Sequence, residues 1–125
     1  MEKRILYIFI VSIMYQPVMG QSSTETITFQ SANPFGFRDV ITALYKQEKQ
    51  EVFGYLTFPE EEKEKYPLII GAAGSLGWSD HHYNYFNMYR ELAIATFEMK
   101  SFTSRGVKST VGTQVEVTLA MMVLD

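Results

Sequence analysis

The sequence contains no cysteine. A chain without thiols cannot form disulfide bonds, bind zinc through thiolates, use a cysteine nucleophile or carry a lipid on an N-terminal cysteine. Histidine is almost as scarce, since His81 and His82 are the only two, so no other imidazole within the chain could act as a base. The 11 lysines and arginines are scattered among 14 acidic residues, and this pattern gives no indication of binding to nucleic acid or to an anionic membrane.

What the chain does have is apolar and aromatic side chains. Its 125 residues allow one small domain. Apolar residues make up 46% of it and aromatic residues 14%, which is enough for a packed core and argues against a disordered chain.

The N-terminus has the pattern of a secretory signal peptide. Lys3 and Arg4 form a positive segment, an apolar stretch (ILYIFIVSIM) follows, and Val18 and Gly20 occupy the positions required for a cut after Gly20. The apolar stretch is too short to span a bilayer comfortably. We therefore expect residues 1–20 to be removed, leaving a secreted or periplasmic protein with no membrane attachment. A buried N-terminal strand or an uncleaved anchor is the alternative.

The next segments differ in how clearly they predict structure. Residues 21–50 are expected to be a polar leader and a loop region around Pro34 and Gly36. Within them, residues 27–31 (ITFQS) could form a short strand, and residues 40–50 could be a helical turn or a strand. Residues 51–59 (EVFGYLTFP) are rich in aromatic and β-branched residues and predict a strand. The charged run at residues 60–65 predicts a solvated connection rather than a partner-binding patch. Residues 66–73 (YPLIIGAA) lack alternation, which favours a strand buried on both faces.

A helix, a strand and a second helix are expected to follow. We predict a helix over residues 81–93, capped by Asp80, whose buried stripe comprises Tyr85, Met88, Tyr89 and Leu92. Residues 94–99 (IATFEM) predict a strand. A helix is expected from about residue 110, on the spacing of Val111, Val115, Leu119 and Met122.

This order predicts an α/β fold, with a mostly parallel sheet, helices on both faces and the last two strands parallel. The final helix carries no termination signal before Asp125. We therefore expect the chain to be the N-terminal portion of a larger protein.

The glycine-rich loop holds the most informative motif, since Ala73-Gly74-Ser75-Leu76-Gly77 has the outline of a nucleophile elbow. An elbow places the serine directly before its helix, whereas residues 77–80 intervene here. Both histidines follow on that helix, and neighbouring helical residues diverge by about 100°. The pattern thus disfavours Ser75 as a nucleophile. It favours an oxyanion-hole loop, with the N–H of Ser75 or Leu76 as donor; a plain turn and, less well, a phosphate loop are the alternatives.

Two motifs in this part of the chain resemble those of the dienelactone hydrolase family, a branch of the α/β-hydrolases. Residues 73–77 resemble its His-Gly-x-x-Gly loop, and residues 101–106 (SFTSRG) its Ser-Phe-x-x-Arg-Gly loop. The resemblance runs from about Val52 to Asp125 and implies an incomplete α/β-hydrolase fold over residues 51–125. Two positions depart from the family, because Ala73 replaces the histidine and Lys100 replaces a common aspartate.

The resemblance also implies a function. The complete protein would hydrolyse a small ester or lactone without a cofactor. Its nucleophile (serine or cysteine), aspartate and histidine would come after Asp125, so this chain alone would be inactive. A small exported binding module without chemistry is the rival hypothesis.

Other polar residues give weaker signals. Trp78, in the glycine-rich loop, is expected to line a substrate pocket or to cover a helix end. Arg105 follows a strand's carboxyl end, where open α/β sheets bind ligands, and could hold a substrate carboxylate or bond loop carbonyls. Asp80, His81 and His82 are adjacent and converge poorly on a metal ion, so no metal site is expected.

Overall fold

The computed structural model describes residues 22–125, so the predicted signal peptide lies outside the described residues. This part of the chain has a mixed α/β fold with a four-stranded sheet and three α-helices. The strands are β1 (Thr24–Ala32), β2 (Lys49–Thr57), β3 (Leu68–Gly71) and β4 (Ala95–Met99). The α-helices are α1 (Phe37–Thr42), α2 (Asp80–Glu91) and α3 (Leu119–Leu124), and two 3₁₀ turns are η1 (Leu44–Lys46) and η2 (Thr103–Arg105).

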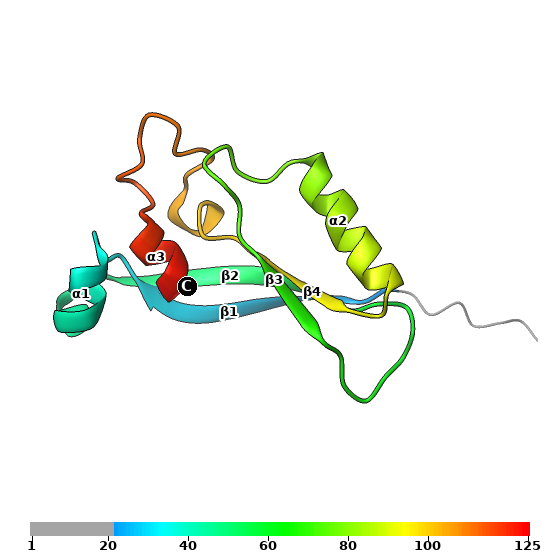
Figure 1. The fold of residues 1–125 in the computed structure, drawn as a ribbon. Coiled ribbons are helices and arrows are strands. Elements are labelled where there is room, and N and C mark those ends of the chain that lie inside the picture. The colour runs from blue at the N-terminus through cyan, green and yellow to red at the C-terminus, as the bar shows by residue number, and fades with distance from the viewer. Residues whose placement is uncertain (1–21) are drawn as a thin grey trace, which may run out of the picture.

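The strand order across the sheet is β1-β2-β4-β3. β3 and β4 are parallel, as predicted, because α2 carries the chain back between them. The prediction of a mostly parallel sheet is wrong, since β2 runs antiparallel to both β1 and β4. No helical crossover of the βαβ kind links β1 to β2; the intervening segment turns the chain around at one end of the hairpin (Figure 1).

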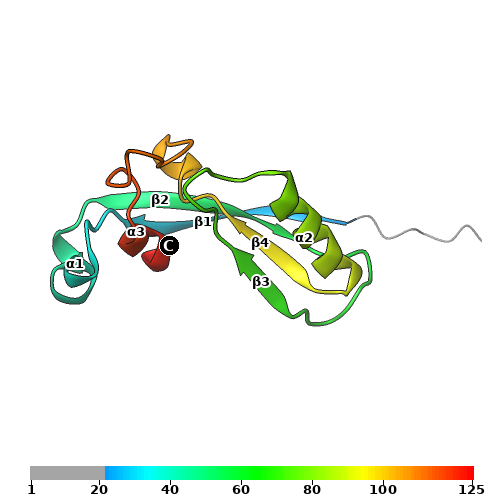
Figure 2. The same ribbon diagram turned by 45° about the horizontal axis from the view of Figure 1, so that its top comes forward.

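Helix α2 covers one face of the sheet over β3 and β4 (Figure 2). The Tyr83 hydroxyl donates a hydrogen bond to Glu98 and the Arg90 guanidinium donates one to Thr96, both at 2.8 Å. Phe86 packs so closely on Gly71 that a Cβ there would come within 2.5 Å of the ring. The helix therefore meets this face through both apolar and polar contacts.

The other face of the sheet carries an apolar cluster. Alternation along the strands places it opposite α2, and it comprises Val52, Phe97 and Met99, with Phe29 and Leu56 packed against them. Helix α3 reaches this face near the end of β1, where the Ser31 hydroxyl donates a hydrogen bond to Asp125 at 2.6 Å. A second apolar cluster joins α3 to the loop after β4 through Phe102, Val117 and Met121.

Two helix predictions need correction. Helix α2 lies where a helix was expected, but the predicted stripe is wrong, because Tyr85, Met88 and Leu92 are exposed and Phe86 is the buried residue. The final helix begins at Leu119 rather than near residue 110. Turns occupy most of residues 110–117, with Gly112 at a φ of 80°, and the Thr118 side chain caps α3 by accepting the Met121 N–H.

Residues 22–50 contain a longer strand than the short one that ITFQS suggested, and also a short helix. β1 pairs with β2 along its whole length, from Thr24 to Ala32. α1 begins where the Asp39 carboxylate accepts the N–H groups of Phe35 and Gly36, both at 3.1 Å. Within residues 22–125, no helix is both long and apolar enough to cross a membrane.

Candidate functional site

The glycine-rich segment after β3 folds into a tight turn. The Gly77 N–H donates to the Gly74 carbonyl at 2.8 Å, so Ser75 and Leu76 are the central residues of the turn. Neither central residue has a positive φ, whereas Gly77 has a φ of 80°. A Cβ at position 77 would lie 2.7 Å from the Lys108 carbonyl oxygen. Both the backbone angle and the close approach therefore require glycine at this position.

A second loop fixes the turn in place. The Ser75 carbonyl accepts the Thr110 N–H at 2.8 Å and the Ser109 hydroxyl at 2.9 Å. The N–H groups of Ser75 and Leu76 donate to no other described residue, and both residues are exposed. The turn thus presents two amide donors on a braced backbone, as an anion-stabilising loop requires.

Neither histidine forms a hydrogen bond with Ser75 among the described residues. Helix α2 begins after Ser79, whose backbone N–H donates to Nδ1 of His82 at 3.0 Å. The Ser79 hydroxyl also lies 2.8 Å from Nδ1 of His81. Both imidazoles bond to Ser79 through Nδ1, and among the described residues no hydrogen bond joins either ring to Ser75.

Trp78 connects the glycine-rich turn to the neighbouring strand. Its indole N–H donates to the Met99 carbonyl at 3.1 Å, at the carboxyl end of β4. Its ring packs against Phe86 of α2, with 5.4 Å between the ring centroids. The hydrogen bond and the packing hold the loop after β3 against the end of β4.

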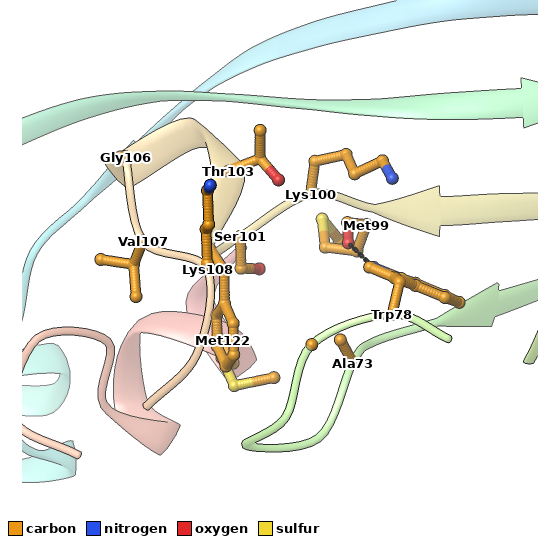
Figure 3. Close-up of a pocket in the computed structure, with 12 residues that line it drawn as sticks. Ala73, Trp78, Met99, Lys100, Ser101, Thr103, Gly106, Val107, Lys108 and Met122 are labelled. Carbon is orange, nitrogen blue, oxygen red and sulfur yellow. Dashed lines mark hydrogen bonds between the residues drawn. The ribbon is translucent and has the colours of Figure 1, made fainter. Parts of the chain in front are cut away.

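A cavity of about 400 Å³ opens between the loops that follow β3 and β4 (Figure 3). Its apolar lining comes from Ala73, Trp78, Met99, Phe102, Val107 and Met122, and its polar side chains are Lys100, Ser101, Thr103 and Lys108. Ligands of open α/β sheets bind at the carboxyl ends of parallel strands, and this cavity has that position. Trp78 lines the cavity. Ser75 and Leu76 are not among the lining residues, although they lie in the sequence between two that are, Ala73 and Gly77.

In the cavity lining, Lys100 is paired with a carboxylate. It forms an ion pair with Glu98, and its ammonium lies over the ring of Trp78, 5.7 Å from the centroid. The Tyr83 hydroxyl donates to the same carboxylate oxygen of Glu98. Burial and this hydrogen bond raise the pKa of Tyr83. The end of β4 therefore carries a carboxylate beside Lys100.

Arg105 lies away from the cavity and is fully engaged. Its Nε donates to Asn33, its two terminal nitrogens donate to both carboxylate oxygens of Asp125 at 2.7 and 2.8 Å, and the remaining N–H groups reach the carbonyls of Ala32 and Ser101. The Arg105 and Asp125 side chains are 5% and 0% exposed. All five donors are in use, so a substrate carboxylate would have to displace Asp125.

The Asp125 carboxylate stays charged in this buried position. Burial disfavours its charge, but hydrogen bonds from Arg105 and Ser31 outweigh burial and lower the pKa of Asp125 below its ordinary value. The Ser101 hydroxyl adds to this effect without reaching the distance and angle of a hydrogen bond.

Several cavity residues were not predicted as site residues from the sequence. Ser101, Lys108 and Met122 come from the loop after β4 and from α3. Only Ser101 carried a usable signal, because it follows a buried strand's carboxyl end. Within residues 22–125, no three histidine, aspartate or glutamate side chains gather where they could hold a metal ion.

Comparison with protein-family models, curated proteins and solved structures found no match to this chain.

Proposed function

We propose that the chain forms the oxyanion-loop portion of an α/β-hydrolase that cleaves small esters or lactones. The observation that carries the proposal is the braced turn of residues 74–77, which leaves the N–H groups of Ser75 and Leu76 without partners among the described residues. In α/β-hydrolases one oxyanion donor comes from the loop between the third strand and the following helix. The turn follows β3 and precedes α2.

The proposal assigns the chain one part of an acyl transfer. As a nucleophile attacks the ester carbonyl, negative charge develops on the carbonyl oxygen, and preorganised N–H groups stabilise it. Ser75 is not paired with a base, since His81 and His82 both bond to Ser79. In this proposal the nucleophile, the carboxylate and the base therefore belong to another segment, and residues 1–125 alone do not turn over esters.

The coding sequence downstream of Asp125 gives the first test. A Gly-x-Ser-x-Gly or Gly-x-Cys-x-Gly motif, followed by an aspartate and then a histidine, is expected there. A stop codon directly after Asp125 in an intact gene would contradict the proposal and favour a binding module that performs no chemistry.

The second test removes one N–H group from the turn. Proline fits the first central position of such a turn and lacks the N–H, so Ser75→Pro in the full-length protein deletes one donor, while the control Ser75→Ala retains it. The pair Leu76→Pro and Leu76→Ala examines the other donor, although proline fits the second central position less well. We expect one proline variant to lose about 10²–10³-fold in kcat on p-nitrophenyl acetate while its alanine control loses little. Loss of activity in Ser75→Ala would instead identify Ser75 as the nucleophile.

A further inference from the structure

The central peptide of the glycine-rich turn, between Ser75 and Leu76, has one of two possible orientations. A turn closed by a bond from its fourth N–H to its first carbonyl is of type I when neither central residue has a positive φ, whereas types II, I′ and II′ need a positive φ at one or both. The bond from Gly77 to Gly74 and the φ angles of the central residues therefore define a type I turn. Type II differs from type I by a flip of the central peptide, which reverses its carbonyl and its N–H.

The two orientations differ in where the amide donors point. In a trans peptide the carbonyl and the following N–H point in opposite directions. The Gly74 carbonyl accepts the Gly77 N–H at 2.8 Å, and this bond exists in both turn types, so the direction of the Ser75 N–H does not depend on the central peptide. In type I the Leu76 N–H points to the same side as the Ser75 N–H. In type II the Ser75 carbonyl oxygen, with its partial negative charge, would take that side.

The loop after β4 binds the carbonyl of this central peptide. The Ser75 carbonyl accepts the Thr110 N–H at 2.8 Å and the Ser109 hydroxyl at 2.9 Å. The Ser109 oxygen in turn accepts the Val111 N–H at 3.2 Å, which leaves its own proton for the Ser75 carbonyl. Thr110 is 4% exposed, and its carbonyl accepts the Thr113 N–H at 3.1 Å. The loop is therefore held by bonds of its own, and a flip of the central peptide would break both of its bonds to Ser75.

We propose that Ser109 and Thr110 act as a peptide lock, which holds the central peptide in the type I orientation and keeps the Leu76 N–H on the side of the Ser75 N–H. Ser109 is thus a positioning residue, because it acts through the Ser75 carbonyl and not on a substrate. The consequence for catalysis, two donors directed at one oxyanion, rests on the function proposed above. The lock itself does not, because it is a property of the backbone and needs neither a nucleophile nor turnover.

Hydrogen exchange at two amides of the 125-residue chain, followed by NMR, tests the lock. A flip of the central peptide breaks the bond from the Thr110 N–H to Ser75 but keeps the bond from the Gly77 N–H to Gly74. It should therefore expose the Thr110 amide to exchange and leave the Gly77 amide protected. General loosening of the turn would instead speed exchange at both amides.

Two pairs of variants weaken the lock from opposite sides. Leu76→Gly removes the side chain that opposes a positive φ, so the Thr110 amide should exchange about tenfold faster while the Gly77 amide is unchanged. Its control Leu76→Ala keeps that steric barrier and should leave both amides unchanged. Ser109→Ala removes one bond to the carbonyl and should speed Thr110 exchange about fivefold, whereas Ser109→Thr retains the hydroxyl and should restore the slow exchange.

Equal acceleration at both amides, or Thr110 exchange that neither Leu76→Gly nor Ser109→Ala changes, would overturn the inference. In the full-length protein the double variant Leu76→Gly/Ser109→Ala should lower kcat by more than the product of the two single effects and leave KM unchanged. The reason is that either element alone keeps most molecules in the type I orientation. A chain that shows this exchange pattern but does not turn over esters would support the lock and contradict only the hydrolase function.

Discussion

The ion pair between Arg105 and Asp125 should be the most sensitive point of the fold. The pair joins three parts of the chain. Arg105 lies in η2 and Asp125 follows α3. Asp125 accepts a hydrogen bond from Ser31 of β1, and Arg105 donates to Ala32 and Asn33 at the end of that strand. Both side chains are almost fully buried. Removing one partner leaves the other charge buried and unpaired, which is far more unfavourable than losing an exposed ion pair.

The expected magnitude follows from that burial. Breaking a buried ion pair from one side costs about 3–5 kcal/mol, whereas a domain of this size has a free energy of unfolding of about 5–15 kcal/mol. We therefore expect Arg105→Met and Asp125→Leu each to lower the Tm by at least about 12 °C. The control Lys63→Met breaks an ion pair whose partners are 39% and 65% exposed, so it should change the free energy of unfolding by less than about 1 kcal/mol.

Urea titration followed by far-UV circular dichroism would measure these differences. In the double variant Arg105→Met/Asp125→Leu neither charged side chain of the pair remains buried. Its loss in the free energy of unfolding should therefore be smaller than the sum of the losses in the two single variants, by about 1–3 kcal/mol. Strictly additive losses, or single losses as small as that of Lys63→Met, would show that the pair does not hold these segments together.

Three further predictions concern the turn, the sheet edge and acid stability. Gly77→Ala should lower the free energy of unfolding by at least about 1–2 kcal/mol, because alanine is strained at a φ of 80° and its Cβ would lie 2.7 Å from the Lys108 carbonyl oxygen; an unchanged urea midpoint would contradict this. β3 lies at an edge of the described sheet, where Leu68 and Ile70 are 50% and 61% exposed, so the chain should self-associate through this strand. The double variant Leu68→Lys/Ile70→Lys should then raise the monomer fraction in size-exclusion chromatography. A parent chain that is already monomeric would contradict self-association through β3. Because the pKa of Asp125 is lowered on folding, the stability it contributes should be complete above its ordinary pKa of 3.8 and lost below that value, and Asp125→Asn should flatten a plot of Tm against pH in that range.

The sequence predicted the helix and strands in the second half of the chain better than the contacts between them. β2, β3, β4 and α2 lie within a few residues of their expected bounds, because composition and turn residues determine such short elements. The buried side of α2 could not be predicted by hydropathy. It meets the sheet through Tyr83 and Arg90, whose partners Glu98 and Thr96 are polar residues buried on β4.

The direction of β2 and the composition of the site depended on distant contacts. Residues 33–48 gave no clear pattern, so nothing in the sequence determined whether β2 would run with or against its neighbours. Arg105 forms its ion pair with Asp125, twenty positions later, and donates to Ala32 of β1, seventy-three positions earlier. Of the predicted site residues, the structure brings Trp78 into the cavity and places Ser75 and Leu76 on the turn beside it. Arg105 is held instead in the ion pair with Asp125.

The strand order also constrains how the chain can fold as it leaves the ribosome. β1 and β2 can pair as soon as both have emerged, whereas β3 pairs only with β4 in the described sheet and must wait for a strand made later. At synthesis rates of about 5–20 residues per second, the apolar LIIG segment of β3 is exposed for seconds. Cotranslational mispairing, or protection by a chaperone, is therefore expected to act on β3 before any other strand.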